Sequence, residues 1–398
     1  MTLLSTPRHI TPTPTSSNAR HQTPMVVLQP DPSAPQLFVS ASEMAAHPRD
    51  IHVATVNVRF DGLRDNPVPI PKHGAVNPRK LSRSGFLDRD RPYAEQPWAV
   101  RRSRLVDALL STGELDIVGF QEVYVSQLED LAVLLGRRFA HVGVGRDDGK
   151  TAGEYSPIFY DQERFECVKW KTMWLSTTPE RPGSVGWDAS QTRIATFLSL
   201  RDKKGGHLVH AVCTHYDDQG VVARANSSFL IRSAIREWVD AVETETQMRG
   251  KKPKAPVILF GDFNSPPNED GYKNITSFWP LKKPSFVFLD AYHHLAERRP
   301  GYDAQSRPYG PDTTWTGFTG PGRTETQRID LIMAAADERA KEGTHVARGG
   351  WVFTQYACID NWVEEGDADG WQGRWSDHRA VRATLVLRGE DLPPHEDL

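Results

Sequence analysis

Cysteine, long apolar runs and net charge are all scarce in this chain, and each scarcity excludes a class of protein. Only three of the 398 residues are cysteine, and they lie far apart in the sequence. This spacing argues against a disulfide framework and a zinc site, and it favours a reducing compartment. No apolar run approaches the length of a membrane span, and the first residues lack the apolar centre of a secretory signal. We therefore expect a cytoplasmic protein, with the nucleus as the alternative, and no membrane association.

The charges of the chain are nearly balanced, so they do not point to one kind of partner. Lys and Arg number 48 and Asp and Glu number 51, for a net charge of -3. This balance offers no global attraction to nucleic acid or to an anionic membrane, although a local basic groove remains open. The sequence also contains no sign of an obligate protein partner. Hydrophobic residues make up 38% of the chain, which is enough for a sizeable core.

Composition divides the chain into a tail, one folded domain and a second, short tail. Residues 1–48 are rich in Pro, Ser and Thr, which predicts disorder. The folded domain is expected over 49–389. Within it, residues 64–97 are basic, contain several prolines and show no periodicity, which indicates a long loop insertion. Residues 390–398 are expected to form an acidic tail.

Apolar periodicity predicts more strands than helices between these tails. Helices are expected at 98–113, 126–136 and 221–243, the second opened by a capping box of Ser126 and Glu129. Some neighbouring strands are joined too tightly for a crossover helix, which favours mixed sheets over a single parallel sheet. The predicted strands are 51–60, 115–120, 139–145, 156–161, 165–176, 192–200, 207–215, 257–260, 285–291, 328–334 and 379–387.

One apolar run ends abruptly in a glycine, an acid, an aromatic residue and an amide. The run 257–260 is typical of a buried strand, and Gly261 then allows the backbone to turn. Asp262 and Asn264 therefore sit at the carboxyl end of an interior strand, the place where ligands bind in open α/β sheets. The alternative is an Asx-turn, in which the two side chains only satisfy turn amides.

Several other predicted strands end in polar groups of the same chemical kind. Each group alone has a simple structural explanation, such as a helix-terminus charge, a buried histidine or a turn cap. Their repeated occurrence beside strand ends is harder to explain in that way. Carboxylates and amides together suit a hard cation such as Mg²⁺ or Mn²⁺. The groups are Asn57, Gln121 with Glu122, Thr214 with His215, Asp217 and Asp218, Asp262 with Asn264, and Asp377 with His378.

Six short motifs occur in an order that resembles a known superfamily. They are "TVN", "GFQEV", "THYD", "GDFNSPP", "RIDLIM" and "SDHRAV". The chain thereby resembles the endonuclease/exonuclease/phosphatase superfamily, which includes deoxyribonuclease I, and most closely its carbon-catabolite-repressor type deadenylase branch. The resemblance implies an α/β fold, a four-layer sandwich with two mixed β-sheets packed face to face and helices on the outside. It also implies metal-dependent hydrolysis of a phosphoester.

The resemblance also implies which residues hold the metal. Glu122 resembles the main ligand of the superfamily, with Asn57 beside it. Asp377 corresponds to a residue that is either a ligand or a support for one. These oxygen donors would bind Mg²⁺ or Mn²⁺, and the sequence does not decide between one ion and two.

Catalytic roles carry over in the same way. Asp262 resembles the residue that orients and deprotonates the attacking water, and Asn264 the one that holds the metal or the phosphate. His378 is expected to face the phosphate, with Asp330 setting its tautomer. His215 resembles the histidine that contacts the scissile phosphate.

Four further residues are candidates for substrate binding, each with a structural alternative. Arg59 stands where many nucleases of the superfamily carry an acid, so it either binds phosphate or pairs with a surface acid. The same two possibilities hold for Arg193. The loop "GRDDGKTAGE" resembles one found in a less studied branch, and its Asp148 and Glu154 either bind sugar hydroxyls or form a solvated turn.

Three functions follow from these observations. The leading hypothesis is a Mg²⁺-dependent 3′–5′ exonuclease acting on single-stranded RNA, favoured by the basic insertion 64–97. The second is a phosphatase or phosphodiesterase acting on a small sugar or inositol phosphate, favoured by the acidic loop and the net charge. The third is an inactive scaffold that binds partners through its Pro-rich tail. The basic residues of the insertion are Lys72, Arg79, Lys80, Arg83, Arg89 and Arg91.

Overall fold

The computed structural model describes most of the predicted domain. All described residues belong to one compact unit, His47–Leu398. The predicted tails and nearly all of the predicted insertion lie outside them, so those boundaries stay predictions. In this described part, no helix is both long and apolar enough to cross a membrane. The described residues are 50–61, 95–251, 253–279, 281–296, 307–318, 327–337, 340–363 and 373–388.

Two six-stranded mixed sheets form the centre of this unit, as the sequence predicts. The first sheet has the order β11 (Trp351–Ile359), β14 (Ala380–Leu387), β1 (Asp50–Asn57), β2 (Ile117–Gln121), β4 (Ile158–Asp161) and β3 (Phe139–Val142). The second has the order β5 (Phe165–Trp174), β6 (Ile194–Asp202), β7 (Leu208–His215), β8 (Val257–Asp262), β10 (Asp330–Ala335) and β9 (Phe288–Asp290). In each sheet one central pair is parallel, β1 with β2 and β7 with β8, and the other described pairs are antiparallel.

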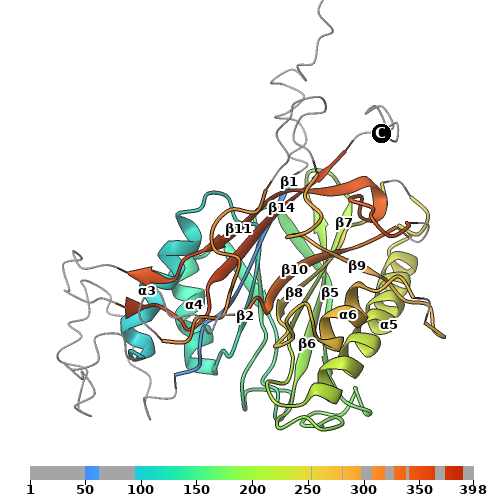
Figure 1. Ribbon diagram of the computed structural model, residues 1–398. Helices are drawn as coiled ribbons and strands as arrows, with labels where there is room; N and C mark the ends of the chain where they lie inside the picture. Colours follow the sequence, from blue (N-terminus) through green and yellow to red (C-terminus); the bar gives the residue numbers. More distant parts are fainter. Residues whose placement is uncertain are drawn as a thin grey trace, which may run out of the picture. The chain divides into compact units, whose positions relative to one another are not determined.

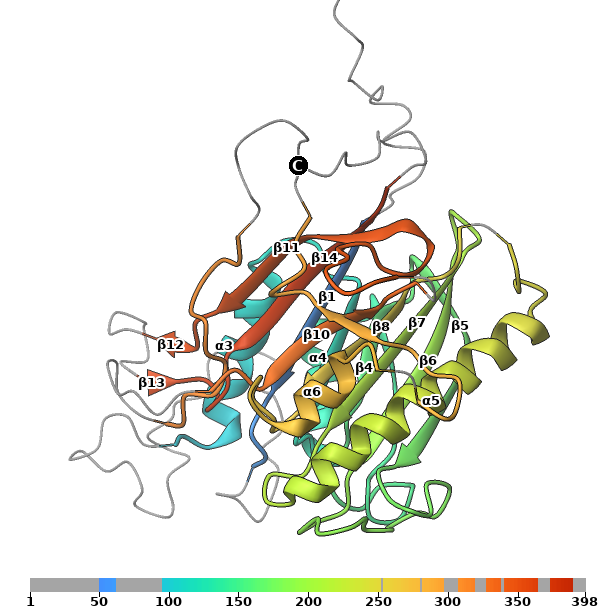
Figure 2. The same ribbon diagram turned by 45° about the vertical axis from the view of Figure 1, so that its right-hand side comes forward.

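Helices cover the outer face of each sheet, so the fold has four layers (Figures 1 and 2). The first sheet packs against α3 (Trp98–Leu110) and α4 (Val125–Leu135), and the second against α5 (Val221–Glu245) and α6 (Asp270–Thr276). A short helical turn, η1 (Arg348–Gly350), and a small pair, β12 (Trp362–Val363) and β13 (Gly373–Arg374), complete the described elements. The predicted four-layer α/β sandwich is confirmed.

The alternation of side chains explains why the central strands read as continuous apolar runs. Val53 of β1 and Phe260 of β8 point into the core between the sheets. Their sequence neighbours Ala54 and Leu259 point to the opposite faces and pack under the helices. A strand that is buried on both faces needs apolar residues at every position, which removes the usual polar alternation.

Several elements were not predicted, and one helix start differs from the prediction. The unpredicted elements include helix α6, strand β11 at the edge of the first sheet, and the short pair β12 and β13. The predicted capping box of Ser126 and Glu129 is wrong, because α4 begins one residue earlier, at Val125. There the Gln127 side chain accepts a hydrogen bond from the backbone N–H of Tyr124 (3.1 Å) and so satisfies the helix start.

The strand directions bring the predicted polar residues to one end of both sheets. The parallel strands β1, β2, β7 and β8 finish there, whereas the antiparallel strands β10 and β14 begin there. Asn57 pairs in register with Gln121, and Asp262 pairs with both His215 and Asp330. Residues from six strands thus meet at one edge of the sandwich.

Candidate active site

A buried asparagine joins the ends of the two sheets. Asn57, at the end of β1, is fully buried. Its Nδ2 donates to Glu122 Oε1 (2.9 Å) of the first sheet and to Asp262 Oδ2 (3.0 Å) of the second. The second oxygen of Glu122 accepts the backbone N–H of Phe60 (3.2 Å). One amide therefore holds two of the predicted site carboxylates in a common position.

The backbone is strained at the same place. Arg59, Glu122 and Asn264 have φ values of 59°, 60° and 45°, in the left-handed region that non-glycine residues rarely occupy. Each such residue costs on the order of 1–3 kcal/mol, and such strain gathers at functional sites. Gly261 (φ 144°) has a different reason to be a glycine, because a Cβ there would lie 2.0 Å from the carbonyl oxygen of Thr214.

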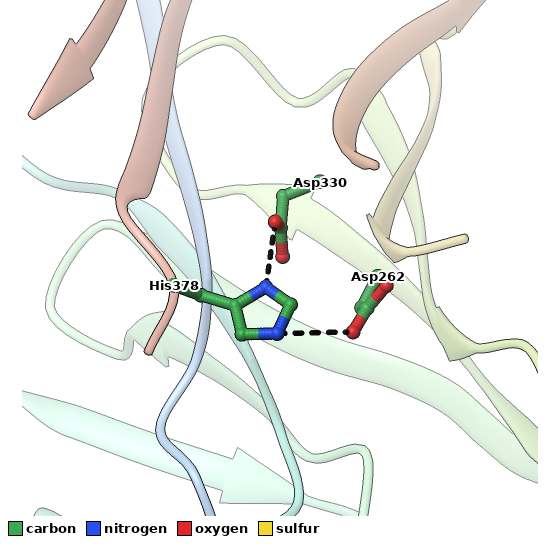
Figure 3. A group of neighbouring side chains, drawn as sticks. All are labelled: Asp262, Asp330 and His378. Atoms are coloured by element: carbon green, nitrogen blue, oxygen red, sulfur yellow. Dashed lines mark hydrogen bonds and ion pairs between the residues drawn. The ribbon is translucent and has the colours of Figure 1, made fainter. Parts of the chain in front are cut away.

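His378 lies between two carboxylates (Figure 3). Its Nδ1 is 2.8 Å from Asp330 Oδ2, and its Nε2 is 3.8 Å from Asp262 Oδ2. Burial opposes a charge on the ring, but the two carboxylates outweigh it and raise the pKa of His378 well above its usual value. Burial, with the charge of Asp330 adding to it, raises the pKa of Asp262 to about 7. The predicted pairing of His378 with Asp330 is present in the structure.

The second histidine has the opposite charge state. His215 Nε2 lies 3.5 Å from Asp262 Oδ2 and 3.1 Å from Asn264 Nδ2. Burial, and then the positive charges of Arg193, Arg146 and His378, lower the pKa of His215 well below its usual value. At neutral pH, Asp262 therefore lies between a protonated and a neutral imidazole. The two rings are chemically distinct although both contact the same carboxylate.

The two arginines proposed for substrate binding occupy different positions. Arg193 is buried, and its Nη1 lies 3.1 Å from each ring nitrogen of His215. The same guanidinium donates from Nε to Asp217 Oδ2 (3.3 Å) and from Nη2 to Asp218 Oδ1 (2.7 Å). Arg59 is partly exposed, with its Nε 3.3 Å from Glu95 and its Nη1 3.8 Å from Glu122. Arg59 is thus the more accessible of the two.

The acidic loop contributes one of its two candidate residues to the site. An isolated bridge between Val123 and Tyr155 places the end of this loop next to Glu122. Glu154 Oε2 lies 3.9 Å from His215 Nδ1 and 2.7 Å from Arg146 Nη1. Burial, with the nearby charge of Glu122 adding to it, raises the pKa of Glu154 to about 7 against the opposing charge of Arg146.

Asp148, the other candidate of the loop, forms hydrogen bonds within the loop. Asp148 is exposed, and its Oδ1 accepts the backbone N–H groups of Lys150 (2.8 Å) and Ala152 (2.9 Å). These bonds correspond to the structural alternative for Asp148, a solvated turn. Substrate binding by Asp148 stays a prediction.

The first sheet carries the oxygen donors that could hold a cation. Asp377 precedes the buried His378 and is partly buried. Burial, and then the charge of Glu122, raise the pKa of Asp377, whereas Arg59 lowers it. The Asn57 amide bonds Glu122 through its nitrogen (2.9 Å), and its oxygen accepts the backbone N–H of Arg59 (2.9 Å). Carboxylate and amide oxygens of this kind suit Mg²⁺ or Mn²⁺ as ligands.

A second group also has a geometry that would admit a metal. One ligand atom each from Asp262, Asp330 and His378 lie within 4.8 Å of one another. The raised pKa of His378 makes this ring a cation that already balances the carboxylates. The donor set of Asn57, Glu122 and Asp377 therefore fits a divalent cation better.

Two supporting residues were not identified as site residues from the sequence. Ser376 Oγ donates to the carbonyl oxygen of Asn57 (2.6 Å) and accepts the backbone N–H of His378 (3.3 Å). Thr314 Oγ1 accepts the backbone N–H of Asp330 (2.9 Å). Ser376 belongs to the "SDH" motif, which was a usable signal. Thr314 is far from every motif in the sequence and carries no such signal.

Comparison with known proteins agrees with this geometry. The Endonuclease/Exonuclease/phosphatase family model matches residues 54–378. An endonuclease/exonuclease/phosphatase from Bacteroides vulgatus is 29% identical, with 85% of this chain and 99% of that chain covered and a TM-score of 0.59. A family protein from Bacteroides thetaiotaomicron is 25% identical (85% and 98% covered, TM-score 0.61). A mannosyl-6-phosphatase from Bacteroides thetaiotaomicron VPI-5482 is 26% identical (84% and 99% covered, TM-score 0.60). No curated protein matches the chain.

Proposed function

Because the chain belongs to the endonuclease/exonuclease/phosphatase family, we propose that it is a metal-dependent hydrolase that removes phosphate from a small phosphorylated sugar or polyol. The observation that carries the proposal is the position of Asp262. This carboxylate lies between a protonated and a neutral histidine and is joined through Asn57 to Glu122. Phosphoester hydrolysis needs this combination of a base for water and positive charge for the phosphate.

Each residue has a defined task in this reaction. Asp262 accepts a proton from the attacking water, and its raised pKa makes it a suitable base near neutral pH. The imidazolium of His378 stabilises the negative charge of the phosphate, and Asp330 fixes its orientation. Neutral His215 and Asn264 offer further contacts to phosphate oxygens.

Mg²⁺ or Mn²⁺, when bound, would neutralise charge on the phosphate oxygens. Asn57, Glu122 and Asp377 are the residues that would hold it. Arg59, which is partly exposed beside Glu122, can approach the same phosphate.

Residues around Glu122 favour a small sugar as the group that carries the phosphate. Phe60 and Tyr124 form an edge-to-face pair with ring centroids 6.0 Å apart, and Arg59 lies over the Phe60 ring (4.3 Å). Tyr124 is 37% exposed, so its ring can contact the apolar face of a sugar. Glu154, on the adjacent loop, can accept hydrogen bonds from hydroxyl groups. The similarity to a mannosyl-6-phosphatase supports the same choice.

Single-stranded RNA is the second candidate substrate. The observation in its favour is the basic composition of the predicted insertion 64–97. Nearly all of that segment lies outside the described residues, so exonuclease activity on RNA stays a prediction. An inactive scaffold is the weakest alternative, since the site keeps a complete set of acid, base and oxygen-donor groups.

A substrate panel tests the proposal. The purified full chain is assayed with mannose 6-phosphate, an inositol phosphate, a short oligoribonucleotide and p-nitrophenyl phosphate, with Mg²⁺, with Mn²⁺ and with excess EDTA. We expect cation-dependent release of phosphate from at least one sugar or polyol phosphate. Preferred cleavage of the oligoribonucleotide would move the assignment to the nuclease. Full activity in EDTA would contradict the metal dependence.

A further inference from the structure

A fully buried arginine on α3 connects the chain segments that end at the candidate cation site. Arg101 is 0% exposed. Its Nε donates to the carbonyl oxygen of Gln96 (2.7 Å), and its Nη1 donates to those of Val58 and Trp375 (2.8 Å each). Its Nη2 donates to the carbonyl oxygen of Arg59 (3.2 Å). One guanidinium thus binds four carbonyls from three separate segments.

Two of those segments carry the candidate oxygen ligands. Val58 and Arg59 directly follow Asn57, and Trp375 lies two residues before Asp377. The Arg59 carbonyl belongs to one of the strained residues, with φ 59°. Strain of this kind persists only where the surroundings determine the conformation. Arg101 shares that task with Gln127, whose Nε2 donates to the same carbonyl (3.1 Å), and with Asn57, whose Oδ1 accepts the Arg59 N–H (2.9 Å). Arg101 alone among them also holds the Trp375 segment against α3.

The partners of the Arg101 guanidinium are backbone groups. Its hydrogen bonds within the described residues all go to backbone carbonyls, so no bonded carboxylate neutralises it. A buried cation without a bonded counter-ion is costly, and the four carbonyl acceptors offset part of that cost. The acids that interact electrostatically with this guanidinium are Glu95, the site residue Asp377 and Asp61, and they oppose the fall that burial causes in the pKa of Arg101.

We propose that Arg101 is a positioning residue of the cation site: it fixes the backbone that carries Asn57 and Asp377 so that their oxygens face one ion. The inference rests on the proposed function, since it assumes that the site binds a divalent cation. Lys cannot replace Arg here, because an ammonium group lacks the planar fork that reaches several acceptors at once. Residues that orient metal ligands typically change metal affinity by about 10–100-fold when they are mutated.

The chain offers a matched control on another helix. Arg232 of α5 is also buried, and its guanidinium donates to the carbonyl oxygens of Phe286 (2.6 Å) and Asn274 (2.7 Å). It therefore clamps backbone in the same way as Arg101. The segments that it holds carry none of the candidate site residues. A Lys replacement at Arg232 reports what the loss of a buried clamp does to stability alone.

The test measures Mn²⁺ binding directly, without using turnover. Electron paramagnetic resonance of free Mn²⁺ gives the Kd for the full chain, for Arg101→Lys and for Arg232→Lys. Thermal unfolding with and without saturating Mn²⁺ is recorded for the same three proteins. We expect both variants to unfold at lower temperature without Mn²⁺. Only Arg101→Lys should raise the Kd, by about 10–100-fold, and lose the extra stabilisation that the bound ion provides.

Each outcome bears on the proposal. Equal Mn²⁺ affinities for the two variants would overturn the positioning role while leaving the proposed function intact. No Mn²⁺ binding by the unmodified chain would overturn the metal dependence, and this inference with it. If Arg101→Lys does not fold, Arg101→Gln is measured instead, because its amide keeps a donor for a carbonyl. An unchanged Kd in that folded variant would likewise overturn the proposal.

Discussion

The two sheets contribute to the site in the same geometry but with different chemistry. Each sheet ends a parallel pair of strands there and begins one antiparallel strand. The first sheet presents Glu122 and Asp377, acids that repel each other and lack a bonded histidine. The second presents Asp262 and Asp330, acids that lie beside the His378 ring.

We propose that this difference separates cation binding from proton transfer. Carboxylates without a bonded imidazole suit a metal, whereas carboxylates paired with imidazoles suit acid–base chemistry. Two residues connect the two sides: Asn57 reaches from the first sheet to Asp262, and His378 reaches from the first sheet to Asp330. Mutations on the first sheet should therefore weaken cation binding, and mutations on the second should slow proton transfer.

The largest effect is expected on the second sheet. Asp262→Asn keeps the shape of the side chain but removes the base, so kcat should fall by roughly 10²–10⁴-fold. The affinity for Mn²⁺ should change little if the second sheet does not hold the ion. Single-turnover rates and Mn²⁺ titrations measure the two quantities separately. A large loss of Mn²⁺ affinity in this variant would break the proposed division between the sheets.

The next effect belongs to the first sheet. Glu122→Gln removes a negative charge from the candidate donor set, so the Kd for Mn²⁺ should rise by at least about 100-fold, beyond the usual effect of an outer support. Activity should partly return at high Mn²⁺ concentration. Asp262→Asn is the control, because its activity should not return. If added Mn²⁺ restores the activity of both variants equally, the proposed separation of cation binding from proton transfer between the sheets is wrong.

A smaller effect is expected on the pH dependence of stability, through Glu154 of the acidic loop. The pKa of Glu154 is raised from 4.5 to about 7, so the folded protein binds its proton more tightly than the unfolded chain does. This group therefore costs no stability below about pH 4.5, and it reduces stability progressively as pH rises to about 7. Glu154→Gln should unfold at a higher temperature than the unmodified chain at pH 8, but not at pH 4.5.

The size of this pH effect has an upper limit of roughly 3 kcal/mol, since one pKa unit corresponds to about 1.4 kcal/mol. Arg146, which pairs with Glu154, will reduce it. Thermal unfolding of both proteins between pH 4.5 and pH 8 measures the difference. A constant difference between the unfolding temperatures of the two proteins over this pH range would show that Glu154 is not protonated more readily in the folded state.

The smallest effect tests the sugar-binding role of the exposed ring. Tyr124→Ala should raise KM for a sugar phosphate by about 2–10-fold, the equivalent of losing one aromatic contact. KM for p-nitrophenyl phosphate should stay the same, because this small ester does not need a sugar contact. Tyr309→Ala removes another exposed aromatic ring (78% exposed) and serves as the control. Equal losses on both esters would assign Tyr124 to the catalytic centre instead.

Local sequence patterns were sufficient for most elements of the fold. The strand 257–260 and the helix 221–243 follow from apolar runs and periodicity, and both are present. Strand β11 was not predicted, although the other edge strands β3, β5 and β9 were. The start of α4 was wrong because two capping patterns overlap within a few residues, and Gln127 prevailed over Glu129.

The candidate residues came from motifs, and their convergence depended on strand direction. Residues as distant as Asn57 and His378 meet because β1 and β14 are antiparallel neighbours. The roles assigned to them stay predictions. The supporting residues Thr314 and Arg101 were not found, since each acts on backbone groups that are remote in the sequence.

The sequence by itself determined the types of residue at the strand ends, the order of the motifs and, through them, the family. Only the tertiary structure decided the charge states. His215 and His378 are the same amino acid and both lie beside Asp262, yet burial and the charges of Arg193 and Arg146 lower the pKa of His215, whereas Asp330 and Asp262 raise the pKa of His378 against burial. A pKa depends on which charges surround a group in space, and no local pattern specifies those neighbours.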